Sequence, residues 1–198
     1  MRRAGIGVPP CGVVSLLDER STERVEATWK QLERELGLRG VLSMPFPHFS
    51  YQIAEGYERE AAEATLAELA RSIAPFTITT TGISTFPEPW PVVFVAIDRV
   101  PYLRTLHERI FSACAPHARA PLDYYRPERW TPHITLAHGE ERNSVPLPAE
   151  TVRTIVATLD PVGYRWTVPI DNLALVWDEG TVQRPVRRFR LSGQRPVK

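Results

Sequence analysis

The sequence predicts an α+β fold in two similar lobes, with mainly antiparallel sheets around a central cleft and helices on the outside. Three observations support this prediction. Segments of helical periodicity alternate with strand-like segments, pairs of strands separated by short turns interrupt that alternation, and each half of the chain contains one His-x-Ser/Thr pattern. We expect one two-lobed domain over residues 1–198, with tails at about 1–10 and 193–198.

The first half of the chain reads as two strand and helix pairs. Ser21 suits the N-cap of the first helix and Gly37 its C-terminal end, while Pro75 closes the second helix. Apolar runs and period-two alternation mark the strands. In order, the expected elements are a strand over 11–17, a helix over 21–36, a strand over 48–53 and a helix over 58–73.

The second half begins with an expected hairpin, because two strand-like runs flank the turn residues 88–91. Pro101 suits the first turn of a third helix. Residues 118–131, which contain several prolines, arginines and aromatic residues, read as an irregular loop. In order, the expected elements are strands over 76–85 and 92–97, a helix over 102–114, a strand over 133–137, a helix over 149–159 and strands over 166–169, 172–177 and 186–191.

Composition excludes several classes of function. The formal net charge is +1, so no global field draws the chain to nucleic acid and any RNA contact must be local. Cys11 and Cys114 lack metal-ligand spacing, which predicts buried thiols in a reducing cytoplasm rather than a disulfide or a zinc site. No apolar run is long enough to span a bilayer, and neither a membrane nor a protein partner is expected.

Two short motifs bring together residue types that suit phosphate chemistry. Side chains at i and i+2 of a strand point to the same face about 6.6–7 Å apart, so His48 pairs with Ser50 and His133 with Thr135. With five histidines and 25 Ser or Thr among 198 residues, such a pattern is expected about 0.6 times by chance. Both motifs follow a proline, start a predicted strand and lie in opposite halves, which favours a shared site over coincidence.

The residues around the second motif, TPHITLA at 131–137, are similar to the Pro-His-hydrophobic-Thr-Leu pattern of the 2H phosphoesterase superfamily. This superfamily includes the 2′-5′ RNA ligase-like proteins and the cyclic phosphodiesterases. The first motif, PHFSY at 47–51, departs from the pattern, with Ser for the commoner Thr and aromatic residues where aliphatic ones are usual. The order of strands and helices over about 11–192 also resembles the two-lobed fold of that superfamily.

This resemblance implies a metal-independent phosphoesterase without a cofactor, acting on a ribose 2′,3′-cyclic phosphate or a 2′-5′ phosphodiester in RNA ends or small nucleotides. The reaction needs a base, an acid and donors to the phosphate oxygens, and two histidines with two hydroxyls supply all four. By resemblance His48 is the acid and His133 the base, with these roles exchanged in the reverse, ligating direction. The alternative is a non-catalytic RNA or nucleotide-binding protein that uses the same cleft.

The loop before the second motif offers candidate substrate contacts. Tyr124, Arg126 and Trp130 combine aromatic rings with a guanidinium, which suits base stacking and phosphate binding. Trp130 directly precedes a predicted strand, where an aromatic residue often belongs to the core.

The remaining histidines read as structural. His107 and His117 are expected at the surface, or as caps, on or just beyond the third helix. His133 and His138 point to opposite faces of a regular strand, so a metal site that joined them with Glu140 would require a bulge.

Overall fold

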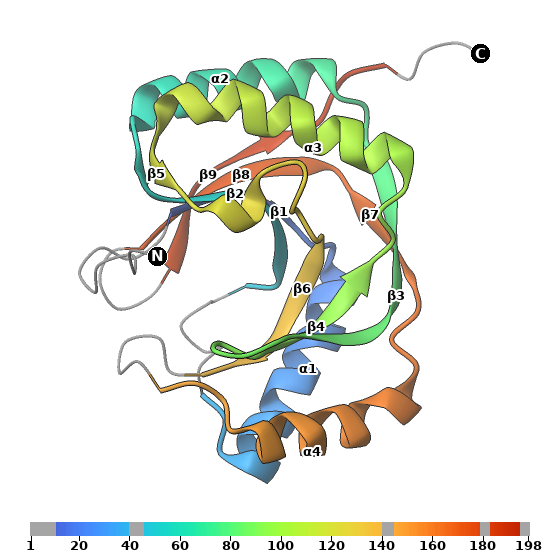
Figure 1. Cartoon of the computed structure of the whole chain (residues 1–198). Coiled ribbons are helices and arrows are strands. Elements are labelled where there is room, and N and C mark those ends of the chain that lie inside the picture. Colours follow the sequence, from blue (N-terminus) through green and yellow to red (C-terminus); the bar gives the residue numbers. More distant parts are fainter. Residues whose placement is uncertain (1–10, 40–45, 140–144, 179–182, 195–198) are drawn as a thin grey trace.

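The computed structural model describes residues 11–39, 46–139, 145–178 and 183–194. Within them nine strands form two antiparallel sheets, and four α-helices lie against the sheets (Figure 1). The expected α+β class is confirmed. The helices are α1 Glu19–Leu36, α2 Arg59–Ser72, α3 Pro101–Cys114 and α4 Ala149–Leu159. The strands are β1 Cys11–Leu16, β2 His48–Tyr57, β3 Phe76–Phe86, β4 Val92–Ile97, β5 Ala118–Pro121, β6 His133–His138, β7 Thr167–Ile170, β8 Asn172–Asp178 and β9 Gln183–Arg190.

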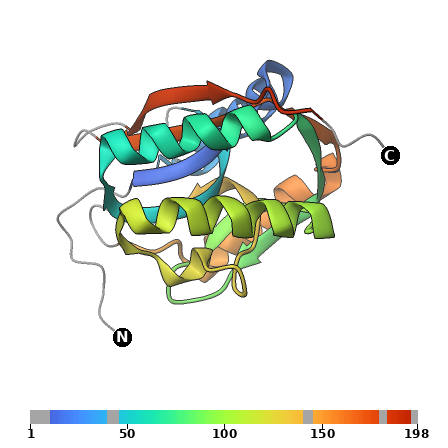
Figure 2. The ribbon, with the colours of Figure 1, turned by 90° about the horizontal axis from the view of Figure 1, so that it is seen from above.

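Each sheet carries its own pair of helices. The five-stranded sheet has the order β5-β2-β1-β8-β9, and α2 and α3 lie side by side over it (Figure 2). The four-stranded sheet has the order β6-β4-β3-β7. Helices α1 and α4 pack against this sheet, at the bottom of Figure 1. Strands β2 and β6, which begin with the two histidine motifs, belong to different sheets and contact each other.

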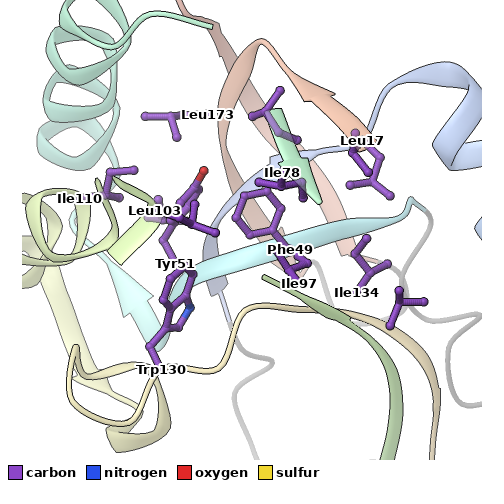
Figure 3. Close-up of a cluster of buried hydrophobic side chains, with 14 of the residues drawn as sticks. Leu17, Phe49, Tyr51, Ile78, Ile97, Leu103, Ile110, Trp130, Ile134 and Leu173 are labelled. Atoms are coloured by element: carbon purple, nitrogen blue, oxygen red, sulfur yellow. The ribbon is translucent and has the colours of Figure 1, made fainter. Parts of the chain in front are cut away.

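One apolar core joins the two sheets and all four helices. Phe49 and Tyr51 of β2 point into it, as does Ile134 of β6, and Figure 3 shows these side chains close together with Trp130. Alternation along the strands explains this, because residues between the polar positions of each motif face the opposite side. Both cysteines are free and buried, as expected, and burial raises the pKa of Cys114 to about 12.

A second, smaller apolar cluster covers the opposite face of the five-stranded sheet. It consists of Val14, Ala174 and Val176, with Leu16 and Phe46 packed against it. This face of the sheet is therefore also partly covered, close to the strand that holds His48.

Several boundaries differ from expectation. Helix α1 begins at Glu19 after Asp18, so Ser21 is not the N-cap but a buried residue whose hydroxyl oxygen accepts a hydrogen bond from Trp166 Nε1 at 3.1 Å. Gly37 does end the helix, with a left-handed φ of 67° that favours glycine. No described helix has the length and apolar character that crossing a bilayer requires.

Two segments expected to be irregular are tied to the sheets and helices. The loop over 118–131 contains β5, which pairs with β2, and a short 3₁₀ turn over Asp123–Tyr125. Near the C-terminus, the backbone N–H of Gly193 donates to the carbonyl oxygen of Ile73 at 3.0 Å. The chain is therefore still attached to the end of α2 within the stretch expected to be a tail, whereas residues 1–10 and 195–198 lie outside the described ranges.

Candidate active site

Both histidines occupy the first position of their strands, and both strands are irregular at the same place. In β2, Ser50 pairs with Val14 and Gln52 with Val13, so Tyr51 is an additional residue that forms a bulge. In β6, Thr135 pairs with Phe94 and Ala137 with Val93, so Leu136 forms an equivalent bulge. Each bulge directly follows the hydroxyl residue of its motif. Bulges of this kind redirect side chains and are frequent beside active sites.

Each imidazole is held in the same way by the backbone. His48 Nδ1 lies 3.0 Å from the carbonyl oxygen of Phe46, and His133 Nδ1 lies 2.7 Å from that of Thr131. A carbonyl oxygen can only accept, so Nδ1 is the donor in both rings. In the neutral ring the other nitrogen, Nε2, then has a free lone pair and can accept a proton. Both motifs therefore present the same ring nitrogen for proton transfer.

The two rings are near enough to influence each other. Burial lowers the pKa of His133 to about 4, against the weaker opposing effect of its hydrogen bond to Thr131, and the charge of His48 lowers it further. Burial also lowers the pKa of His48, and its hydrogen bond to Phe46 opposes that change. As whole residues, His48 and His133 are partly exposed. At neutral pH His133 is therefore unprotonated, and its Nε2 can accept a proton.

Aromatic rings account for much of the burial of His133. Phe86 of β3 meets the imidazole edge-on with 4.9 Å between ring centroids, and Phe94 of β4 lies 5.1 Å away. These apolar neighbours disfavour the charged imidazolium. His48 has one such neighbour, Phe46, at 5.9 Å.

The backbone of each hydroxyl residue is hydrogen-bonded by a tryptophan indole. Trp130 Nε1 donates to the carbonyl oxygen of Ser50 at 2.8 Å, and Trp29 Nε1 of α1 donates to that of Thr135 at 3.1 Å. Ser50 is 8% exposed, and Thr135 is less buried. Each indole thus bonds the backbone of one hydroxyl residue and helps to fix its position.

Trp130 was expected as a substrate contact, but it is 1% exposed and its N–H is occupied by Ser50. We therefore assign it a positioning role. Its ring stacks on His107, with centroids 3.8 Å apart and planes at 9° (its packing with Tyr51 is visible in Figure 3). His107 Nε2 donates to the carbonyl oxygen of Tyr51 at 2.9 Å.

The placement of His107 corrects the expectation of a surface residue. It is 1% exposed on the buried face of α3, and burial lowers its pKa to about 4. His107 and Trp130 together hold consecutive carbonyls of β2, those of Tyr51 and Ser50. His117 is only partly buried, and its Nε2 lies 3.0 Å from the hydroxyl oxygen of Thr65.

The other two expected substrate contacts lie in the 3₁₀ turn that precedes the second motif or next to it. Tyr124 is 64% exposed, and the exposed Arg126 forms an ion pair with Asp123 at 2.8 Å. The turn is anchored to β2, because Leu122 N donates to the carbonyl oxygen of Ile53 at 2.8 Å. Both side chains are thus free to meet a ligand, but no interaction of the described residues ties them to the histidines.

In a regular strand, His133 and His138 would point to opposite faces and could not share a metal ion. The bulge at Leu136 breaks this alternation, so that argument does not apply here. Glu140 lies outside the described residues, and His138 Nδ1 donates to the carbonyl oxygen of Gly139 at 2.6 Å. Among the residues that the structure describes, no three or more His, Cys, Asp or Glu side chains gather as metal ligands. His138 lines a surface hollow with Leu38 and Leu147 that does not include His48 or His133.

The fold is that of a 2H phosphoesterase. A family model described as the 2′-5′ RNA ligase superfamily matches residues 21–182, a stretch that includes both motifs. The chain belongs to the 2′-5′ RNA ligase superfamily. A search of curated protein sequences found no match. Family membership supports phosphoesterase activity in general.

Solved structures agree with this assignment at the level of the fold. The chain is similar to TT0787 of Thermus thermophilus, with a TM-score of 0.67 and 20% identity over 94% of this chain and 100% of that one. It is also similar to E. coli LigT in complex with 3′-AMP, with a TM-score of 0.58 and 19% identity over 93% and 99% of the two chains. For E. coli LigT in complex with ATP, the TM-score is 0.54 and the identity 17% over 93% and 98%.

Proposed function

We propose that this protein hydrolyses a ribose 2′,3′-cyclic phosphate or a 2′-5′ phosphodiester by two-histidine acid-base catalysis without a metal ion. The observation that supports this most directly is the matched anchoring of His48 and His133 through Nδ1, with the two rings close enough for their charges to interact. The reaction requires one proton to be taken and another to be given, and two equivalent imidazoles suit that requirement.

In the proposed step, Nε2 of His133 accepts a proton from water while the water oxygen forms a bond to phosphorus. The bond from phosphorus to one ribose oxygen breaks, and the imidazolium of His48 gives its proton to that oxygen. Ser50 and Thr135 donate hydrogen bonds to the phosphate oxygens that gain charge. The pKa of about 4 supports His133 as the base, and a bound phosphate anion favours the protonated form of His48.

Substrate recognition beyond the phosphate is proposed for Tyr124 and Arg126. The exposed ring of Tyr124 suits base stacking. The guanidinium of Arg126 suits a phosphate, since its partner Asp123 is also exposed and such an ion pair is readily exchanged. E. coli LigT has been crystallised with 3′-AMP and with ATP, and we propose that a nucleotide is bound here too.

The test is turnover of the four nucleoside 2′,3′-cyclic monophosphates in excess EDTA, followed by separation of the 2′- and 3′-phosphate products. We expect turnover to persist in chelator, because the acid, the base and the donors are all side chains. Loss of turnover in EDTA and its return with a divalent cation would contradict the mechanism. Binding of nucleotides or RNA without turnover of any cyclic phosphate or 2′-5′ diester would favour the non-catalytic alternative.

The pH dependence of kcat/KM sharpens this test, because it reports the free enzyme. His133 must be unprotonated, so its pKa of about 4 places the acidic limb near that pH. His48 must be protonated, and its pKa lies below the ordinary 6.5, so activity falls again before neutrality. We expect a bell-shaped profile with an acidic limb near pH 4 and low activity at neutral pH. A kcat/KM that still rises above pH 7 would contradict the assignment of acid and base.

A further inference from the structure

Strand β9 concentrates positive charge in a protein that is otherwise nearly balanced. Its sequence, QRPVRRFR, contains four arginines and no acidic residue, whereas the whole chain has a formal net charge of +1. It is also an edge strand of the five-stranded sheet. The positions of the side chains are described for Arg187, Arg188 and Arg190, and these three divide between the two faces of the sheet.

The strand register identifies which arginines share a face with the catalytic motif. Arg188 pairs with Ala174 of β8, Ala174 pairs with Val14 of β1, and Val14 pairs with Ser50 of β2. Directly paired residues lie on the same face of a sheet. Arg188 therefore lies in the same row as Ser50 and on the same face.

Arg190 lies on this face as well, next to the row of the catalytic histidine. It pairs with Asn172, whose side chain bonds the backbone of Leu16, and Leu16 pairs with His48. Arg187 lies on the opposite face, where it forms an ion pair with Glu63 of α2 at 3.2 Å. One strand thus carries two arginines on the catalytic face and one that is directed at a helix.

The distance across the sheet shows which part of a ligand the arginines can meet. Three strand separations, or about 14 Å, lie between the backbones of β2 and β9. Phe46 packs over the two intervening strands, against Val14, Ala174 and Val176. A single phosphate held by His48 and Ser50 does not extend over this distance, so a cation on β9 meets a different phosphate of the same ligand.

Both arginines are available for such a contact. Arg190 is exposed, and Arg188 is 51% exposed in an ion pair with the 50% exposed Asp171 at 2.7 Å. Exposed ion pairs contribute little to stability, so a phosphate can displace the carboxylate from Arg188. Partial burial acts to raise the pKa of Asp171, but hydrogen bonds from Asn172 and Arg188, with the charges of both arginines, outweigh it and lower that pKa. Asp171 therefore remains a charged competitor for Arg188.

We propose that Arg188 and Arg190 form a second phosphate site, and that the preferred substrate is therefore the end of a single-stranded RNA rather than a mononucleotide. This rests on the proposed function, in which the scissile phosphate lies between His48 and His133. The strand supplies the local positive charge that a nearly neutral protein needs to hold an RNA backbone. Its arginines contact phosphate and do not read the base sequence.

The test compares two substrates that share the scissile group, a nucleoside 2′,3′-cyclic monophosphate and a hexanucleotide that ends in a 2′,3′-cyclic phosphate. In Arg188→Gln, and more strongly in the double variant Arg188→Gln/Arg190→Gln, we expect KM for the hexanucleotide to rise about tenfold. KM and kcat for the mononucleotide should not change. The slope of log KM against log salt for the hexanucleotide should become shallower by about 0.7 for each phosphate that the variant no longer binds.

Arg187→Gln is the matched control, because it removes the same charge from the same strand on the other face, and both substrates should behave as with the wild type. Asp171→Asn removes the competing carboxylate and should lower KM for the hexanucleotide alone. Equal effects of Arg187→Gln and Arg188→Gln, or no effect of the double variant on the hexanucleotide, would overturn the second site while the proposed function stands. If neither substrate is turned over by the wild type, anisotropy of a labelled hexanucleotide with the same variants still decides the RNA site.

Discussion

Strands β2 and β6 hold the same arrangement of imidazole and hydroxyl groups by different means. Each begins with a histidine whose Nδ1 bonds the carbonyl two residues earlier, and each has a bulge after its hydroxyl residue. Their supports are unrelated, since Trp130 from a loop holds β2 and Trp29 from α1 holds β6. The two motifs are therefore alike in backbone geometry and differ in the residues that support them.

The asymmetry has a chemical consequence. His133 contacts two phenylalanine rings and has a pKa of about 4, while His48 has one aromatic neighbour. Two equivalent histidines would compete for the same role. The proposed mechanism needs one base and one acid, and the more apolar surroundings of His133 favour it as the base.

The largest expected effect is loss of either histidine. His48→Ala and His133→Ala should each lower kcat/KM about 10²- to 10⁴-fold, since each removes one proton transfer. His133→Ala should remove the acidic limb of the pH profile and His48→Ala the alkaline limb. The double variant should be little worse than the weaker single variant if the two act as a unit.

His138→Ala provides the control for these variants. It removes a histidine from β6, the strand of His133. The side chain of His138 lines a hollow that does not include His48 or His133. Its kcat/KM should remain near that of the wild type, and thermal melting should show that all three single variants fold. A His138 variant as impaired as His133→Ala would show that strand damage, and not lost chemistry, explains the effect.

Removal of the hydroxyls should have the next largest effect. Ser50→Ala and Thr135→Val should each weaken transition-state binding by about 2–4 kcal/mol, or about 30- to 1000-fold in kcat. Thr135→Ser keeps the donor and should recover most of the activity, as should Ser50→Thr if the buried position has room for a methyl group. Steady-state kinetics on a cyclic phosphate measures both, and unchanged kcat in Ser50→Ala and Thr135→Val would remove the hydroxyls from the mechanism.

The indole supports can be compared by replacing each tryptophan with phenylalanine. Trp130→Phe and Trp29→Phe keep an aromatic ring but leave the carbonyl of Ser50 or Thr135 without its donor, at about 1–3 kcal/mol of unfolding free energy. We expect kcat to fall by up to about tenfold with little change in KM, because the hydroxyls lose their position and the phosphate site keeps its charge.

Trp166→Phe separates this positioning role from stability alone. Trp166 Nε1 donates to the hydroxyl of Ser21, away from both motifs, at 3.1 Å. This variant should lose stability in chemical denaturation but keep its kcat. A parallel fall of kcat in all three tryptophan variants would show that general destabilisation is the cause.

The last prediction concerns stability rather than turnover, through the pH dependence at His107, whose ring stacks on Trp130. Its pKa is about 4 in the folded chain and about 6.5 when unfolded, so between these values the unfolded chain binds more protons. Stability contributed by the neutral ring is complete above about pH 6.5 and is lost as the pH falls towards 4, on the order of 3 kcal/mol. Urea unfolding at several pH values should show a flatter dependence in His107→Gln. An identical slope in wild type and variant would contradict a neutral, buried His107.

Local patterns in the sequence were sufficient for most of the fold and for both motifs. Helices α2, α3 and α4 and the hairpin β3 and β4 follow from periodicity and turn residues, which act over a few positions. His107 could have been recognised as buried, because it shares the 3.6-residue pattern with Leu103, Leu106 and Ile110 on the apolar face of α3.

Other features depend on contacts that no local pattern contains. Trp130 and Ser50 are 80 residues apart in sequence, and Trp29 and Thr135 are 106 apart, so their hydrogen bonds follow only from the packed structure. The four residues of β5 gain strand geometry from pairing with β2 and carry little periodicity of their own. The bulges likewise arise from the fit between neighbouring strands.

The bulges at Tyr51 and Leu136 also determine which changes of chain length the two strands tolerate. Loss of one codon from a regular strand turns every later side chain to the other face. Loss of the bulge residue itself preserves the facing of all the others, because Ser50 and Gln52 already pair with the adjacent residues Val14 and Val13. A lineage can therefore shorten either strand directly beside its motif, at the expense of one large core side chain, and still present the histidine and hydroxyl to the same side.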